Sequence, residues 1–180
     1  MSQAGRLLVA TPLIGDPTFE RTVVLLLAHG DGGAFGVVLN RPSDTGVCEV
    51  IDGWSEAVTA PSVVFIGGPV NPEEVIGLAR RGGPDHNFAG LVGELGTVDL
   101  HSPPEPGEQP WPGLRMYAGA AGWSAGQLED EIAEGAWWPV DAAPDDILTG
   151  DPARLWERVL RRQRGTTGWF ANYPKDLSAN

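Results

Sequence analysis

Short apolar runs, separated by glycine, proline and acidic residues, alternate along most of the chain. Nearly continuous apolar runs predict strands covered on both faces, and they occupy residues 6–10, 22–28, 35–39 and 62–66. Shorter runs bounded by turn-forming residues predict further strands at residues 75–79, 91–92, 97–100, 114–118 and 137–140. The segments 81–89 and 102–112 are predicted loops, the second because it contains five prolines.

Helical spacing appears mainly in the second half of the chain. Leu128 and Ile132 stand four residues apart, as on one face of a helix. Ser124 followed by Gln127 is a capping-box pattern, so the helix is predicted to begin there and to end near Gly135. Residues 47–54 are predicted as a short helix, and residues 143–148 as one or two helical turns.

The last predicted helix begins after Asp151, which would cap it, with Pro152 at its first position. Four apolar residues form its buried stripe and four arginines its solvent-facing side. These are Leu155, Trp156, Val159 and Leu160, and Arg154, Arg158, Arg161 and Arg162.

Several strands precede the helices, without a regular alternation of strand and helix. This order is typical of the α+β class, with a mainly antiparallel β core and two to four helices packed against it. We expect one domain over residues 1–180, with 163–180 as a C-terminal tail. Trp169 and Phe170 in that tail would pack either on the domain or on a second subunit, and the oligomeric state stays open.

The strands predicted at 22–28 and 35–39 flank a glycine-rich turn, which predicts a β-hairpin. The two ends of an antiparallel hairpin lie side by side. We therefore expect five polar residues to converge there, beside three prolines that stiffen the backbone. They are Asp16, Glu20, Arg21, Asn40 and Arg41, with Pro12, Pro17 and Pro42.

A candidate site follows from this convergence. Gly67, Gly68 and Gly122 would let a ligand or another strand approach the backbone closely, and nearby polar and aromatic groups are of kinds that line small-molecule pockets. The candidate ligand-binding residues are Pro12, Asp16, Phe19, Asn40, Arg41, Gly67, Gly68, Pro69, Gly122, Trp123, Gln127 and Glu131. The same polar groups could instead satisfy turns and helix caps, and the sequence leaves both interpretations open.

The formal net charge of −12 argues against two classes of partner. Nucleic acids and anionic membranes both attract Lys and Arg, so neither direct DNA binding nor membrane association is expected. Five of the twelve basic residues lie in 154–164. Without a helix-turn-helix pattern, this cluster is interpreted as a solvated helix face.

Cys48 is the only cysteine, so an internal disulfide cannot form, as is typical of a reducing cytoplasm. It lies in an apolar segment and is interpreted as a small buried hydrophobe. The first residues do not resemble a secretory signal, and no apolar run approaches the roughly 20 residues that span a membrane. We therefore expect a cytoplasmic protein.

Catalytic templates give little support for an enzyme. His29, His86 and His101 are scattered along the chain, so neither a metal site nor a cofactor is expected. Ser124 lies in G-W-S-A-G but is interpreted as a helix cap, because no obvious histidine partner follows it. The glycine-rich turn at 30–36 lacks the Lys-Ser/Thr ending of a phosphate-binding loop.

Several motifs together resemble the AlgH/YqgE family of bacterial proteins. They are Leu7 to Pro12 (L-L-x-A-x-P), Asp16 to Phe19 (D-P-x-F), His29 with Gly33 to Pro42 (H-x-x-x-G-A-x-G-x-V-x-N-R-P), Val64 to Val70 (VFIGGPV) and Gly119 to Glu131. Ala120 departs from the family, which usually has Tyr at that position. The resemblance implies an AlgH-like fold and an association with transcriptional regulation of exopolysaccharide synthesis.

The favoured interpretation is a binding or regulatory module with a small-molecule pocket. Its walls would be the hairpin ends, the turn at 67–69 and the start of the helix near Trp123. One alternative is a hydrolase-like enzyme that uses Asp16 or Glu131 as acid or base, with Arg41 holding an anion. Another is a purely structural or protein-interaction domain.

Overall fold

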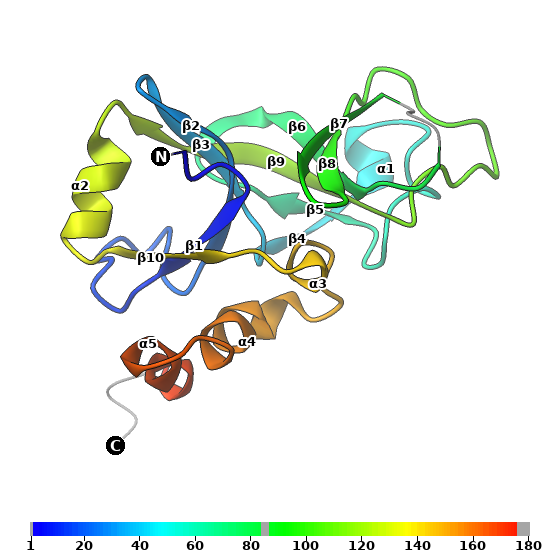
Figure 1. Cartoon of the computed structure of the whole chain (residues 1–180). Coiled ribbons are helices and arrows are strands. Elements are labelled where there is room, and N and C mark those ends of the chain that lie inside the picture. The colour runs from blue at the N-terminus through cyan, green and yellow to red at the C-terminus, as the bar shows by residue number, and fades with distance from the viewer. Residues whose placement is uncertain (1, 84–86, 176–180) are drawn as a thin grey trace.

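The computed structural model describes residues 2–83 and 87–175. In these residues ten strands form a mostly antiparallel, curled sheet, with five short α-helices around it (Figure 1). The strands are β1 (Arg6–Ala10), β2 (Val23–Gly30), β3 (Gly33–Val38), β4 (Pro42–Gly46), β5 (Val63–Ile66), β6 (Val70–Arg80), β7 (Phe88–Val92), β8 (Leu95–Val98), β9 (Gly113–Ser124) and β10 (Trp137–Asp141). The helices are α1 (Val47–Val50), α2 (Gln127–Ala133), α3 (Pro144–Ile147), α4 (Leu155–Arg161) and α5 (Thr166–Trp169), with 3-10 turns η1 (Pro152–Arg154) and η2 (Phe170–Asn172).

The sheet runs in the order β10-β1-β2-β3-β9-β6-β8-β7. Strand β4 pairs with β5, and β5 joins the sheet parallel to β9. Strands β2 and β3 form the predicted hairpin, in which Gly30 pairs with Gly33 across a two-residue turn. The predicted α+β class with a mainly antiparallel core is confirmed.

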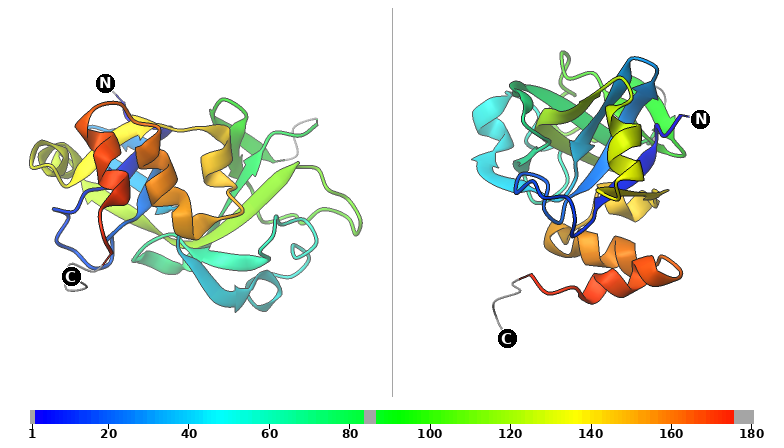
Figure 2. Two further views of the ribbon diagram at one scale, coloured as in Figure 1. Left: turned by 90° about the horizontal axis from the view of Figure 1, so that it is seen from below. Right: turned by 90° about the vertical axis from the view of Figure 1, so that its left-hand side faces the viewer.

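Strand β1 is buried on both faces, as its continuous apolar sequence predicts, and so are the first half of β2 and the second half of β3, whereas the ends of β2 and β3 at their shared turn are partly exposed. Leu7 and Val9 of β1 pack in one cluster with Trp156 of α4. The next residue along, Leu8, points to the opposite face and packs in a second cluster with Leu128 of α2. Helices α2 and α4 thus cover opposite faces of this part of the sheet, and Figure 2 shows α4 and α5 across its lower face.

A third apolar cluster lies under α1 and the proline-rich segment. Trp54 and Trp111 stack there with ring centroids 5.7 Å apart. Residues 102–112 contribute Trp111 to this cluster but contain no strand or helix, as predicted. The segment therefore covers the core without joining the sheet.

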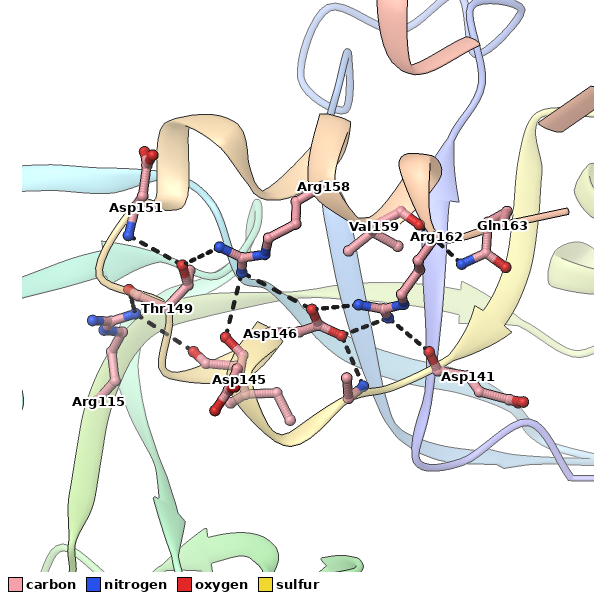
Figure 3. Close-up of polar contacts among 12 residues, drawn as sticks. Arg115, Asp141, Asp145, Asp146, Thr149, Asp151, Arg158, Val159, Arg162 and Gln163 are labelled. Carbon is pink, nitrogen blue, oxygen red and sulfur yellow. Dashed lines mark hydrogen bonds and ion pairs between the residues drawn. The ribbon is translucent and has the colours of Figure 1, made fainter. Parts of the chain in front are cut away.

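Helix α4 is fastened to α3 by a nearly buried carboxylate (Figure 3). The two guanidinium nitrogens Nη1 and Nη2 of Arg162 donate to the two carboxylate oxygens of Asp146 at 2.7 and 2.6 Å. The same carboxylate accepts the backbone N–H of Ala143 at 2.8 Å. Arg158 lies 4.0 Å from it and donates to Thr149 Oγ1 at 3.0 Å. Two of the four predicted solvent-facing arginines therefore hold the helix in place.

Two strands are longer than predicted, and this shifts the start of α2. Strand β6 continues past a register shift between Val70 and Val75, and β9 continues to Ser124. Ser124 is therefore the end of a strand rather than a helix cap; the N-cap is Gly126. The side-chain oxygen of Gln127 nevertheless accepts the backbone N–H of Ser124 at 3.0 Å.

The last helix also begins later than predicted. Pro152 takes the first position of η1, and α4 follows from Leu155. The preceding Asp151 makes no capping hydrogen bond through its side chain within the described structure. The four apolar residues predicted as the buried stripe are indeed buried.

The segment predicted as a tail contains α5 and η2, while residues 176–180 lie outside the described part. Phe170 packs on Trp138 of β10 at a centroid distance of 5.0 Å, so the segment docks back on the domain. Trp169 stays 77% exposed. Strand β7 takes the end of the predicted loop 81–89, of which residues 84–86 are not described.

The prediction that Cys48 is buried is wrong, because its side chain is exposed. Helix α1 has one turn, and Val47 alone fills the core from it. The neighbouring positions of so short a helix point away from the sheet. Over residues 2–83 and 87–175, no helix is both long and apolar enough to cross a membrane.

Candidate functional site

The hairpin ends are joined by the amide of Asn40. Its Oδ1 accepts the backbone N–H of Val23 at 3.0 Å, and its Nδ2 donates to the carbonyl oxygen of Arg21 at 2.9 Å. Beside it, Arg41 donates from Nη2 to the carbonyl oxygen of Glu20 at 2.5 Å. The expected convergence at the hairpin ends is therefore present, and the side chain of Asn40 links the backbone on the two sides.

Arg21 connects this region to the C-terminal segment. Its guanidinium carbon lies 4.0 Å from the centre of the Trp156 ring, which is a cation–π contact. Its Nη2 donates to Glu157 Oε1 at 3.2 Å, and its Nη1 to the carbonyl oxygen of Tyr173 at 2.9 Å. Arg21 has a positive φ of 54°, which turns the loop before β2 toward α4.

Between these two regions lies a two-part cleft, which we call the hairpin-end cleft. Its inner cavity measures about 320 Å³ and its outer cavity about 560 Å³. Both are lined by Pro17, Glu20, Arg21, Trp156 and Lys175. The inner cavity adds Ala10, Thr11, Pro12, Ile14, Gly15, Asp16, Tyr173 and Pro174. The outer cavity adds Asn40, Arg41, Pro42, Pro152 and Ala153.

Four predicted site residues therefore line the cleft, namely Pro12, Asp16, Asn40 and Arg41. Asp16 also closes its own turn, because its Oδ1 accepts the backbone N–H of Thr18 at 2.8 Å. Phe19 points to the other side of the loop, where its ring meets that of Trp137 edge-on at 5.6 Å.

A second group of predicted site residues lies with Phe19 on the α2 side of the sheet. Glu131 Oε2 accepts the indole N–H groups of Trp123 and Trp137, each at 2.8 Å. Its other oxygen accepts Nε2–H of Gln127 at 2.9 Å. Glu131 lines neither part of the cleft, so the structure does not bring it together with Asp16.

The Gly67–Gly68–Pro69 turn serves strand packing. A Cβ on Gly67 would collide with the carbonyl oxygen of Gly119, and one on Gly68 with the backbone of Ala120. The sequence left open whether a ligand or another strand approaches these glycines, and in the structure it is strand β9. Gly122 lies on β9 opposite Phe35, and none of these four residues lines the cleft.

The G-W-S-A-G motif sits where β9 turns toward α2, and within the described residues it lacks the hydrogen-bonded histidine of a nucleophilic serine. Ser124 Oγ lies 3.2 Å from Gln127 Oε1. His29 forms a histidine–carboxylate pair with Glu129, at 2.7 Å from Nε2 to Oε1. His29 Nδ1 already accepts the backbone N–H of Gln3 at 3.0 Å, so neither ring nitrogen is left to take a proton from Ser124.

Outside the cleft, hydrogen bonds and burial shift several pKa values. A hydrogen bond from its own backbone amide, followed by that from His29, lowers the pKa of Glu129. Burial lowers the pKa of the Arg115 guanidinium and raises the pKa of Tyr117. Arg115 donates to the carbonyl oxygens of Thr149 and Ala60, at 2.8 and 3.1 Å, which is a structural role.

The candidate metal ligands are not gathered into a cluster. Among the described residues, no three His, Cys, Asp or Glu side chains are placed to hold a metal ion together. His86 lies outside the described residues. His101 contacts Asp99, and His29 contacts Glu129.

The sequence did not indicate the C-terminal side of the cleft. Trp156 was predicted only as core, and Tyr173, Pro174 and Lys175 only as tail. Each of these residues reaches the cleft through tertiary packing, and the contact from Arg21 to Tyr173 spans 152 positions. The cation–π pairing of Arg21 with Trp156 has no local sequence signal that could have revealed it.

Comparisons with known proteins agree on one family. A family model described as AlgH-like matches residues 7–168. A UPF0301 protein of Streptomyces avermitilis is 48% identical over 99% of this chain and 96% of its own length. A crystal structure of a Corynebacterium diphtheriae protein is 34% identical, with a TM-score of 0.87 over 94% of this chain and 92% of that one. The solution structure of the AlgH protein of Pseudomonas aeruginosa is 28% identical, with a TM-score of 0.69 over 98% and 97% of the chains.

Proposed function

The chain belongs to the AlgH-like family, and we propose that it is a binding module that takes a small organic molecule into the hairpin-end cleft. The regulatory role that the family resemblance implies would then depend on whether the cleft is occupied. The proposal concerns binding, and it assigns no reaction to the protein.

The observation that carries the proposal is the cleft itself. Its two cavities fall within or near the range of about 300–1,000 Å³ that is usual for small-molecule sites. Its lining combines aromatic and proline surfaces with a few polar groups, which is the composition typical of such sites. Arg21 braces both sides of the cleft through Trp156 and Tyr173, so the cavity is largely preformed.

Asn40 is a poor variant for testing this proposal. Its amide makes two hydrogen bonds to the hairpin ends, so Asn40→Ala would lower stability whether or not a ligand binds. Loss of a thermal shift in that variant could not separate binding from folding. Ala153 is better suited, because it is exposed and lines the outer cavity.

The test is a thermal-shift screen of a metabolite panel on the wild type, Ala153→Trp and Ala133→Trp. Ala133 is exposed on α2, outside the cleft, and serves as the matched control. A ligand at about a hundred times its Kd stabilises the folded state by roughly 2.7 kcal/mol. In a domain of this size that raises Tm by about 5–10 °C.

We expect at least one compound to raise the Tm of the wild type and of Ala133→Trp but not that of Ala153→Trp, since the indole would fill the outer cavity. A compound that stabilises all three proteins equally binds elsewhere and counts against the proposal. A broad panel without a hit would also contradict it.

A further inference from the structure

We propose that the ligand of the hairpin-end cleft is a small organic anion that carries a flat apolar group. This inference rests on the proposed function and specifies its ligand class. The apolar group would occupy the inner cavity and the anionic group the outer cavity.

The inner cavity has apolar residues among those that it does not share with the outer cavity. Ala10 and Ile14 come from the first strand and its loop, and Tyr173 and Pro174 come from the C-terminal segment. Trp156 lies at the boundary with the outer cavity, where its indole N–H is already bonded to the carbonyl oxygen of Ala10 at 2.8 Å. Trp156 therefore adds no unsatisfied donor to the cavity wall. Because its ring is buried and covered by Arg21, the apolar surface open to a planar hydrocarbon comes from Ile14, Tyr173 and Pro174.

The outer cavity gathers positive charge in an acidic protein. Among the described residues, Arg21, Arg41 and Lys175 line it, with Glu20 as the one carboxylate. Arg21 is paired with Glu157 at 3.2 Å. Arg41 contacts only a backbone carbonyl, and Lys175 has no side-chain partner among the described residues.

Within residues 2–83 and 87–175, two cations without a carboxylate partner therefore face the same cavity. A carboxylate or phosphate group would supply the missing acceptors and form charge-assisted hydrogen bonds, which are stronger than neutral ones. A long polyanion is a poorer candidate, because beyond the cleft it would meet a protein of net charge −12. A small anion feels mainly the local charge, because salt screens charges beyond about 8–10 Å.

The test compares ligands of one shape and three charges. Benzoate, benzamide and benzamidine are flat, similar in size, and carry a negative, zero and positive charge; acetate supplies the anion without the ring. Binding to the full protein is measured by an amide NMR titration that follows Gly15 and Asp16 in the inner cavity. We expect benzoate to bind about three- to tenfold more tightly than benzamide, with benzamidine and acetate weaker still.

Charge variants of the protein should change benzoate binding in opposite directions. Arg41→Gln and Ala153→Glu are expected to weaken it, while Glu20→Gln is expected to strengthen it, each about threefold or more. Ala153→Gln is the matched control for Ala153→Glu because it adds the same bulk without charge. Arg164→Gln is the control for Arg41→Gln, because Arg164 is exposed and lines neither cavity. Benzamide binding should be unaffected by the charge of residue 153.

The outcomes separate this inference from the proposed function. Equal binding of benzoate and benzamidine would overturn the anion preference. The proposed function would still hold if Ala153→Trp abolished both. Failure of benzoate to bind would likewise overturn the inference. The proposed function would still hold in that case if a neutral or cationic compound from the metabolite panel bound to the wild type but not to Ala153→Trp. If Ala153→Trp affects no compound at all, both proposals fail.

Discussion

Two residues that were predicted as site residues, Glu131 and Asn40, use their side chains for hydrogen bonds within the protein. Glu131 accepts three side-chain hydrogen bonds. Asn40 makes two hydrogen bonds to backbone groups at the hairpin ends. Both uses follow from the need to satisfy buried polar groups. The indole N–H groups of Trp123 and Trp137 lie in the core, and Glu131 Oε2 is the acceptor for both.

Glu131→Ala should therefore reduce stability rather than leave it unchanged. The substitution leaves the indole N–H groups of Trp123 and Trp137 without their acceptor, and an unsatisfied buried donor costs about 1–3 kcal/mol. We expect the free energy of unfolding in urea to fall by at least about 2 kcal/mol. Glu134→Ala on the same helix, where the side chain is exposed, is the control and should change it by less than about 0.5 kcal/mol.

An unchanged free energy of unfolding in Glu131→Ala would show that water or a rearranged neighbour replaces the carboxylate. Such a result would reopen a functional role for Glu131.

Among the elements, those set by local sequence were predicted and those set by distant contacts were not. The β2–β3 hairpin was predicted because its turn and its two apolar runs are adjacent. Strands β6 and β9 were predicted too short, since Pro72 and Gly119 suggest breaks that their pairing with each other overrides. Helix α5 carries no amphipathic pattern and was missed.

For the candidate site, too, the part set by local sequence was predicted and the part set by distant contacts was not. The hairpin supplies one side of the cleft, and that side could be placed from the sequence. The other side depends on where α4 and the C-terminal segment dock, which is decided by Trp156 under β1 and by Arg21. Side chains brought together from opposite ends of a chain leave no periodic pattern.

The docking of α4 should depend on Asp146 of α3. Asp146→Asn removes one acceptor and the negative charge that Arg162 and Arg158 share. Hydrogen bonds to charged groups contribute about 1.5–3 kcal/mol each. Because Arg162 is partly exposed, we expect the free energy of unfolding to fall by about 2 kcal/mol. Relative to the wild type, amide hydrogen exchange should speed up more in α4 than in β2.

The control for this experiment is Asp145→Asn, whose side chain is 95% exposed at its contact with Arg80. It should leave exchange in α4 unchanged. Equal exchange rates in both variants would contradict the role given to Asp146.

Across the whole molecule, charge is unevenly distributed. Residues 151–175 carry six basic and two acidic side chains, within a chain of net charge −12. Of the six, Arg158 and Arg162 approach Asp146, and Arg154 and Arg161 have carboxylates at 4.0 and 3.9 Å. Arg158 and Arg162 therefore serve packing within the C-terminal part, while Arg154 and Arg161 form exposed ion pairs on the surface.

We expect no retention of a DNA duplex in a gel-shift assay, even at low salt. Arg158 and Arg162 are occupied by Asp146 and are not available to replace the counterions of phosphates, and the net charge of −12 repels the duplex from the rest of the protein. A salt-sensitive shift that disappears in Arg161→Gln/Arg164→Gln would contradict this expectation. That pair is preferred because Arg158 and Arg162 are needed to hold α4.

The bracing of the cleft by Arg21 also has a consequence for biosynthesis. A ribosome makes Arg21 152 positions before Tyr173. The hairpin side of the cleft is therefore synthesised before its C-terminal side exists. A ligand that needs both sides of the cleft would therefore bind only once the C-terminal segment has been made, and it would stabilise the finished protein rather than guide the early steps of folding.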